Sequence, residues 1–458
     1  MTKDFSKLLY KKTNGFKSMS DDELDEVFGY AIAYKKFLDN SKIEREAVRY
    51  AIGEAITRGY SEATFDSKLS VGDKIFFNNK DKCIALVKIG KNGLKNGVRM
   101  IISHVDSPRL DLKQLPLYEK NDTAYLKTHY YGGIKQYQWL TVPLAMHGRI
   151  MLKDGSSVDV ALGEKEDDPI FYISDLLPHL SKDKQNQKLK DVFVAENLNI
   201  ICGGIPAEGV EKDAFKCNVL AILNDMYGLV EEDFLSAEIE FVPALKARDV
   251  GFDRSYIAAY GHDDKVCAYS GLTALFDSND ENTSIMYFVD KEEIGSNGVS
   301  GAESKFVMDV IEKLSNEFGE NFANVRAKSM CISADVTSAY DSNFSEAFES
   351  QNSSYLSHGV AVNKYTGAAG KSGTSDASAE LTSYIRDLFD SNNVLWQAGE
   401  IGKIDQGGGG TVAKFIANQN IDTIDIGVPV ISMHAPYELI SKMDLYSAYK
   451  GYKAFFNK

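Results

Sequence analysis

Residues 97–106 read GVRMIISHVD, and this sequence is the clearest sign of a buried strand in the chain. The run is short and mostly apolar, as expected for a strand that is buried on both faces of a sheet. It ends directly in His104 and Asp106, two side chains that can bind a metal ion or move a proton. Ligand sites in open α/β sheets lie beyond the carboxyl ends of the strands. These residues therefore predict a metal-binding or catalytic site at the edge of a sheet where the strands end.

Other apolar runs are bordered by side chains of the same kind. The residues that follow three later runs are Glu292 and Glu293, Asp335, and His434, and Asp263 stands before the apolar segment 266–276. Two imidazoles and several carboxylates, without a thiolate, suit zinc, cobalt or manganese. The adjacent carboxylates of Glu292 and Glu293 repel each other unless a cation or a shared proton compensates. A single His or Asp at a strand end is more often a helix cap or a surface group. The prediction of a metal site therefore rests on finding such residues at the ends of several strands together.

Helix and strand patterns alternate around these runs. Ser20 with Glu23, and Ser41 with Glu44, match the capping box that begins a helix, and the second helix should end near Gly59. A strand, turn and strand are expected near 76–90, and helices near 303–318, 376–390 and 437–456. This alternation predicts an α/β fold with a mostly parallel central sheet flanked by helices.

The middle of the chain has a different pattern. A length of 458 residues is too great for one compact core. Residues 110–246 contain short alternating segments and a charged stretch, which predicts an inserted, largely β domain. Residues 1–109 and 247–458 would then form one discontinuous domain that holds the metal site.

Composition excludes several classes of partner. The formal net charge is −15 and no cluster of Lys and Arg stands out, so nucleic acid and anionic membranes are not expected partners. The five cysteines show no CxxC spacing, which argues against a disulfide framework and favours a reducing compartment. No apolar stretch reaches membrane-spanning length, and the first residues lack an apolar signal core. We expect a cytoplasmic protein.

Five motifs follow one another along the chain. They read SHVDSPRLDL (103–112), GHDDKVCAYSGLTAL (261–275), DKEEIGSNG (290–298), SADVT (333–337) and SMHAPYE (432–438). In this order they resemble the aspartyl aminopeptidase / aminopeptidase I family of dinuclear zinc metallopeptidases, and the resemblance spans most of the chain. HYYGGIKQYQW (129–139) looks like the bacterial branch. The resemblance implies a zinc-exopeptidase-like fold and removal of N-terminal residues from short or unfolded peptides.

The resemblance also implies a role for each matching residue. Two divalent ions, zinc or alternatively cobalt or manganese, would be held by His104 and Asp335 on one side, by Glu293 and His434 on the other, and by Asp263 between them. Glu292 matches the general base that activates a water shared by the metals. Asp106 matches the carboxylate that orients a ligand histidine. The peptide bond between Asp263 and Asp264 is expected to be cis.

Other expectations concern the substrate and the assembly. In relatives the inserted domain pairs two chains and acts as a lid, and the pairs form a closed dodecamer; His179 lies near the position of a histidine that reaches a neighbouring active site. A preference for acidic N-terminal residues needs a cation, for which Lys135, Lys364 and Lys371 are candidates. By base rate each lysine is more often a solvated surface residue, so a neutral preference stays open.

Two other functions compete with an aminopeptidase. An N-acyl-amino-acid deacylase or dipeptidase of the same superfamily would share the metal site but differ in the inserted domain. A non-catalytic assembly protein would keep the fold, but such proteins usually lose the base or the ligands, and none of these is missing here. The sequence therefore favours the aminopeptidase.

Overall fold

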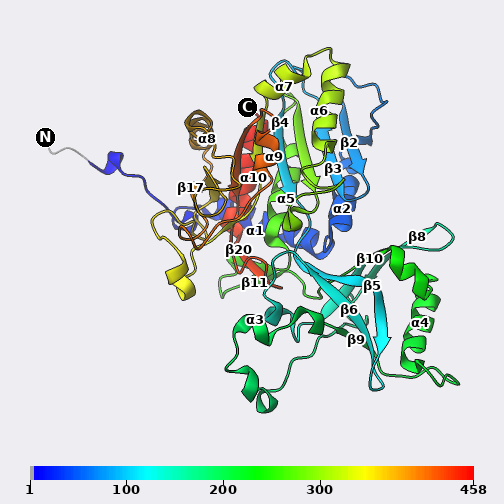
Figure 1. The fold of residues 1–458 in the computed structure, drawn as a ribbon. Helices are drawn as coiled ribbons and strands as arrows, with labels where there is room; N and C mark the ends of the chain where they lie inside the picture. Colours follow the sequence, from blue (N-terminus) through cyan, green and yellow to red (C-terminus); the bar gives the residue numbers. More distant parts are fainter. Residues whose placement is uncertain (1–4) are drawn as a thin grey trace.

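A computed structural model describes residues 5–458, and its main element is a nine-stranded sheet (Figure 1). The strand order is β1-β2-β3-β13-β4-β14-β18-β16-β17. The strands are β1 (Ser61–Glu62), β2 (Lys74–Asn79), β3 (Cys83–Lys88), β4 (Arg99–His104), β13 (Ser284–Val289), β14 (Met330–Ser333), β16 (Val360–Asn363), β17 (Trp396–Ala398) and β18 (Asp422–Gly427). The central strands β13, β4, β14 and β18 are parallel neighbours. Their carboxyl ends therefore meet at one edge.

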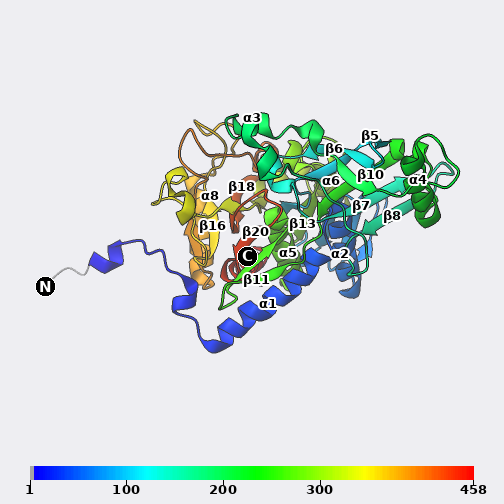
Figure 2. The ribbon, with the colours of Figure 1, turned by 90° about the horizontal axis from the view of Figure 1, so that it is seen from below.

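Helices cover both faces of this sheet (Figures 1 and 2). One face packs against α1 (Asp21–Asp39), α2 (Glu44–Thr57), α5 (His262–Phe276), α8 (Ala379–Ser391) and α10 (Lys442–Phe456). The other face packs against α6 (Phe306–Glu317), α7 (Phe322–Lys328) and α9 (Ala413–Ala417). Each face has its own hydrophobic core. Side chains of β4 alternate between these two cores, since Ile101 belongs to the first and Ile102 to the second. The predicted α/β fold with helices on both faces is confirmed.

The two predicted helix starts had different outcomes. Ser20 caps α1, and its side chain and that of Glu23 form the expected capping box. The second box is absent, because α2 begins at Glu44 with Ile43 at the N-cap position. There the carboxylate of Glu46 accepts the backbone N–H of Lys42 at 2.8 Å. The prediction that Ser41 caps this helix was therefore wrong, although the helix ends close to Gly59 as expected.

A six-stranded antiparallel sheet comes from the middle of the chain. Its order is β8-β7-β10-β5-β6-β9. The strands are β5 (Arg109–Glu119), β6 (Ala124–Tyr131), β7 (Leu144–Met151), β8 (Ser157–Leu162), β9 (Ile200–Gly203) and β10 (Ala237–Pro243), with the short helix α3 (Leu189–Val192) between β8 and β9. The helix α4 (Ala214–Tyr227) lies against this sheet and was not predicted (Figure 1). The β character of the segment was correctly expected, but its helical part was missed.

A third, five-stranded sheet corrects one expectation. Its order is β11-β12-β20-β19-β15. The strands are β11 (Arg248–Val250), β12 (Tyr256–Ala259), β15 (Thr337–Ser338), β19 (Pro429–Ile431) and β20 (Glu438–Ser441). The run before His434 was expected to be a strand of the main parallel sheet, but it splits at Gly427 into β18 and β19. Residues 437–441, expected to begin the last helix, mostly form β20.

Among the described residues, no helix has both the length and the apolar character needed to cross a membrane.

Candidate metal centre

Three side chains meet at the carboxyl ends of β4 and β14. His104 is the last residue of β4, Asp335 follows β14, and Asp263 lies in the first turn of α5. The His104 Nε2 atom is 3.2 Å from Asp263 Oδ1 and 3.9 Å from Asp335 Oδ1. One donor atom from each of the three residues lies within 4.8 Å of the others. This spacing is close enough for a single ion.

A second group shares Asp263. The other carboxylate oxygen of Asp263, Oδ2, is 3.2 Å from His434 Nε2, and that nitrogen is 3.4 Å from Glu293 Oε2. Donor atoms of these three residues also lie within 4.8 Å of one another. Asp263 therefore faces a different imidazole with each of its two oxygens. The peptide bond between Asp263 and Asp264 is cis, as the family resemblance implied.

Both imidazoles are oriented through Nδ1. The His104 Nδ1–H donates to the backbone carbonyl oxygen of Asp106 at 3.0 Å. The His434 Nδ1–H donates to the backbone carbonyl oxygen of Gly133 at 2.9 Å. With Nδ1 protonated, Nε2 of each ring carries the lone pair that a metal ion requires.

Asp106 is fully buried and connects several parts of the centre. Its Oδ1 atom lies 3.3 Å from His104 Nδ1 and accepts the backbone N–H of Glu292 at 3.2 Å. Its Oδ2 atom accepts the backbone N–H of Glu293 at 3.2 Å and the hydroxyl of Tyr131 at 2.8 Å. Burial opposes ionisation of Asp106, but the neighbouring His104 and Tyr131 hold its pKa below the usual range. Asp106 thus fixes the orientation of one ring and the backbone of the Glu292–Glu293 pair.

Glu292 and Glu293 differ in their surroundings. The side chain of Glu292 is 18% exposed, whereas that of Glu293 is 3% exposed. Burial raises the pKa of Glu292 to about 7, and the charges of Asp106 and Asp263 act in the same direction. A carboxylate with such a pKa can accept a proton near neutral pH and release it again. Glu293 Oε1 is buried and has no hydrogen-bond partner among the described residues, as expected for a ligand atom.

The carboxylates of this centre are crowded, which favours a bound cation. Burial raises the pKa of Asp335 and of Glu293 well above the ordinary value, and the charge of Asp263 acts in the same direction on both. Burial opposes the positive charge of His434, but Asp263 and Glu293 raise its pKa to about 10. Crowded carboxylates around two imidazoles whose Nε2 atoms face them match the nitrogen and oxygen ligands of zinc, and a bound ion would take the place of the Nε2 protons. The residues present therefore fit a metal centre.

Sequence reasoning missed Glu438. This buried residue begins β20, and its carboxylate accepts the backbone N–H of Asp263 at 3.0 Å and of His434 at 2.7 Å. Burial and the charge of Asp263 raise the pKa of Glu438 to about 8. The only available signal was its place at the end of the SMHAPYE motif.

A cavity of about 600 Å³ opens beside His434. Its lining residues are mostly apolar or aromatic and include Tyr137, Phe344, Phe348 and Met433, with Lys135, Asp341 and Glu346 as the charged ones. Of the three lysines named from the sequence, only Lys135 lines this cavity.

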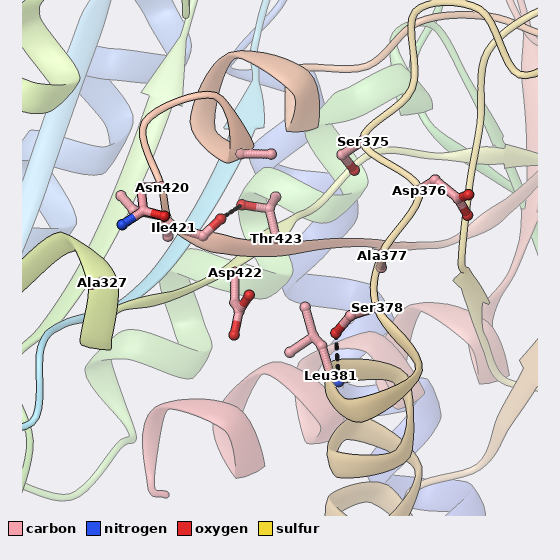
Figure 3. Close-up of a pocket in the computed structure, with 11 residues that line it drawn as sticks. Ala327, Ser375, Asp376, Ala377, Ser378, Leu381, Asn420, Ile421, Asp422 and Thr423 are labelled. Carbon is pink, nitrogen blue, oxygen red and sulfur yellow. Dashed lines mark hydrogen bonds between the residues drawn. The ribbon is translucent and has the colours of Figure 1, made fainter.

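The other two lysines share a partner elsewhere. Lys364 Nζ lies 2.8 Å from Asp376 Oδ1, and Lys371 Nζ lies 3.3 Å from Asp376 Oδ2. Asp376 lines a polar hollow of about 270 Å³ at the amino end of β18, together with Asp422 (Figure 3). Because β16 runs antiparallel to β18, Lys364 leaves the sheet toward this end.

His179 lies outside the metal centre of its own chain. It belongs to the 3-10 helix η4 (Pro178–Leu180) and is exposed.

Comparisons with known proteins identify the family of the chain. The family model described as aminopeptidase I zinc metalloprotease (M18) matches residues 37–456. A "Probable M18 family aminopeptidase 1" from Borrelia garinii subsp. bavariensis is 47% identical, covering 98% of this chain and 100% of the relative. The one from Clostridium acetobutylicum is 44% identical, covering 98% and 99%.

Solved structures give the same result. The crystal structure of an M18 aminopeptidase from Thermotoga maritima superimposes with a TM-score of 0.94 at 40% identity, covering 98% of this chain and all of that one. That of aminopeptidase I from Clostridium acetobutylicum has a TM-score of 0.92 at 41% identity, with the same coverage. This chain therefore belongs to the M18 family of aminopeptidase I zinc metalloproteases.

Proposed function

We propose that the protein is a dinuclear metallo-aminopeptidase that hydrolyses the N-terminal peptide bond of short or unfolded peptides. The observation that carries this proposal is the position of Asp263, whose two oxygens lie 3.2 Å from His104 and from His434. One carboxylate can then bridge two ions. The ligands of one ion would be His104, Asp263 and Asp335, and those of the other Asp263, Glu293 and His434.

Different residues of the chain have separate roles in the proposed reaction. When bound, two zinc ions would lower the pKa of a shared water and polarise the scissile carbonyl. Glu292 has the exposure and the pKa to take a proton from that water and pass it to the leaving amine. The carboxylate of Asp106 accepts the backbone N–H of Glu292 and so holds that backbone in place. A free α-amino group bound beside the second ion would limit cleavage to the first residue of a peptide.

The cavity beside His434 is the proposed site for the substrate side chain. Lys135 is the one lysine in its lining and is the best placed of the three lysines to meet an acidic side chain. Asp341 and Glu346 in the same lining oppose a second negative charge. Lys364 and Lys371 are already paired with Asp376. We therefore favour neutral over acidic N-terminal residues.

The assembly and the compartment are also proposals. Residues 110–246 contribute the six-stranded sheet, which we propose as the dimerisation and lid domain. The dimers would assemble further into a dodecamer, in which His179 reaches a neighbouring active site. A yeast aminopeptidase structure of the same fold, 20% identical, is described as a dodecamer. All five cysteines are free, which fits a reducing cytoplasm.

A substrate panel tests the function. Purified protein would be loaded with zinc, cobalt or manganese and assayed on aminoacyl-anilides, on unblocked peptides and on the same peptides acetylated at the N-terminus. The proposal expects cleavage of unblocked substrates only, with neutral residues preferred. Release of acetate from the acetylated compounds would indicate a deacylase, and absence of both bound metal and activity would indicate an assembly protein.

A further inference from the structure

One short segment of the six-stranded sheet reaches both halves of the metal centre. Tyr131 is the last residue of β6, and its hydroxyl donates to Asp106 Oδ2 at 2.8 Å. Two residues later, the backbone carbonyl of Gly133 accepts the Nδ1–H of His434 at 2.9 Å. The segment thus contacts the carboxylate that orients His104 and also the ring of His434.

The two glycines of this segment allow the close approach. Gly132 has a φ of +73°, and a Cβ atom there would lie 3.2 Å from Glu293 Cβ and Oε2. A Cβ atom at Gly133 would lie 3.3 Å from His434 Nδ1. Side chains at either position would crowd the ligands, so the bare backbone is needed here.

The hydroxyl of Tyr131 completes the contacts of Asp106. Without it, Asp106 Oδ2 keeps only the backbone N–H of Glu293, at 3.2 Å. Asp106 would then be less firmly placed against His104 and against the backbone of Glu292. A buried carboxylate oxygen that loses a hydrogen-bond donor is destabilised.

The segment is itself firmly held. Arg109 pairs with Tyr131 across β5 and β6, and its guanidinium lies 3.9 Å from the centroid of the Tyr131 ring. The Arg109 Nε atom is 3.0 Å from Glu240 Oε2 in β10, and its guanidinium is 3.6 Å from Glu44 in α2. The ring of Tyr131 is therefore fixed to both the six-stranded sheet and the helix layer of the main sheet.

We infer that residues 131–133 position the ligands of both metal ions, with Tyr131 as a positioning residue that acts through Asp106. The inference rests on the proposed metal ligands. Residues 131–133, which read YGG, would then orient the metal ligands, in addition to any role of the six-stranded sheet in assembly.

A conservative pair of variants tests this inference. Tyr131→Phe removes only the hydroxyl, and Tyr130→Phe makes the same change at the adjacent residue, which is 39% exposed. Zinc dissociation constants would be measured by competition with a chromogenic chelator, together with the pH profile of kcat. Tyr131→Phe should weaken zinc binding by up to ~10-fold, the lower end of the scale for losing a group bonded directly to a ligand, because Tyr131 acts one contact further away, and should shift the pH profile. Tyr130→Phe should match the wild type.

The remaining outcomes are distinguishable. Gly133→Ala keeps the Tyr131 hydroxyl and should weaken mainly the ion held by His434, while the other ion stays tightly bound. If Tyr131→Phe binds zinc and titrates as Tyr130→Phe does, the inference is overturned while the proposed function stands. If the wild-type protein binds no zinc under conditions where it is folded, the proposed function itself fails.

Discussion

The carboxylate of Glu438 accepts the backbone N–H of Asp263 at 3.0 Å, although 175 residues separate the two along the chain. Its second oxygen accepts the backbone N–H of His434 at 2.7 Å. Two donors thus occupy both oxygens of one buried side chain. Glu438 thus joins the backbone of Asp263, the proposed bridging ligand, to that of His434, a proposed ligand of the second ion.

The first prediction concerns this link. In Glu438→Gln the amide nitrogen would face a backbone N–H, so one of the two hydrogen bonds is lost. Zinc affinity should fall ~10-fold or more, measured by chelator competition. Glu400→Gln, which alters a carboxylate bound by Tyr365, is the matched control and should leave the affinity unchanged. Equal affinities in the two variants would show that Glu438 does not position the ligands.

The second prediction concerns the general base. Glu292→Gln should keep both ions, because Glu293 is the ligand, but kcat should fall ~100-fold or more. Metal analysis and steady-state kinetics on the same preparation check this. Turnover close to that of the wild type would rule out the role of Glu292 as base.

The third prediction separates the two ions. Asp263→Ala should lose both ions together, because each oxygen of Asp263 serves one group of ligands. His434→Ala should mainly weaken one ion. Elemental analysis of the purified variants distinguishes them, and two ions per chain in Asp263→Ala would contradict the bridging role.

The fourth prediction concerns pH and His147, a buried residue of β7. Its Nδ1 is 2.7 Å from Glu46 Oε1 in α2, and its Nε2 is 3.2 Å from Glu164 Oε1. Burial opposes its charge, but the two carboxylates raise its pKa to about 9, against an ordinary value of 6.5. The stabilisation is therefore complete below pH 6.5 and is lost as pH rises through 9.

Thermal unfolding of a variant checks the sign. The Tm deficit of His147→Gln relative to wild type should be largest below pH 6.5 and should shrink toward pH 9. The free energy involved is about 3 kcal/mol at most, from the size of the pKa change. His358→Gln, a histidine bonded to the nearby backbone of Leu356, serves as control. A Tm deficit that stays constant with pH would disprove the ion pairs.

The fifth prediction concerns assembly. Light scattering should show a species near twelve chains, built from dimers. His179→Ala should lower kcat of the assembled protein while leaving zinc content unchanged, since His179 is exposed in its own chain. A fully active monomer would exclude both the need for the dodecamer and the role of His179 in a neighbouring active site.

Local sequence patterns predicted the main sheet and the ligand-bearing strand ends. The run before His104 forms a buried strand because its apolar residues serve the two cores alternately. The split before His434 could not be read locally. It depends on Gly427, where a Cβ atom would lie 1.6 Å from the backbone oxygen of Asp335. Close contact between two distant segments, and not the apolar run itself, determines where the strand ends.

The supporting residues were harder to predict than the ligands. The proposed metal ligands stand beside apolar strands and share a restricted set of residue types, so a sequence pattern can predict them. Glu438 and Tyr131 act through contacts with residues 175 and 25 positions away, and their residue types are common on any surface. Helix α4 was missed because the alternating segments around it indicated only strands.

The path of β5 and β6 has a consequence for chain continuity. The chain leaves the centre at Pro108, runs out along β5, turns at residues 120–123, and returns along β6 to Tyr131. Residues 109–112 pair with 128–131 and residues 117–119 pair with 124–126, so both ends of the two strands should stay bound if the turn is cut. Two fragments, 1–121 and 122–458, should reassemble into an active protein when produced together. In that case the peptide bond at the far end of the two paired strands would not be needed to build the site.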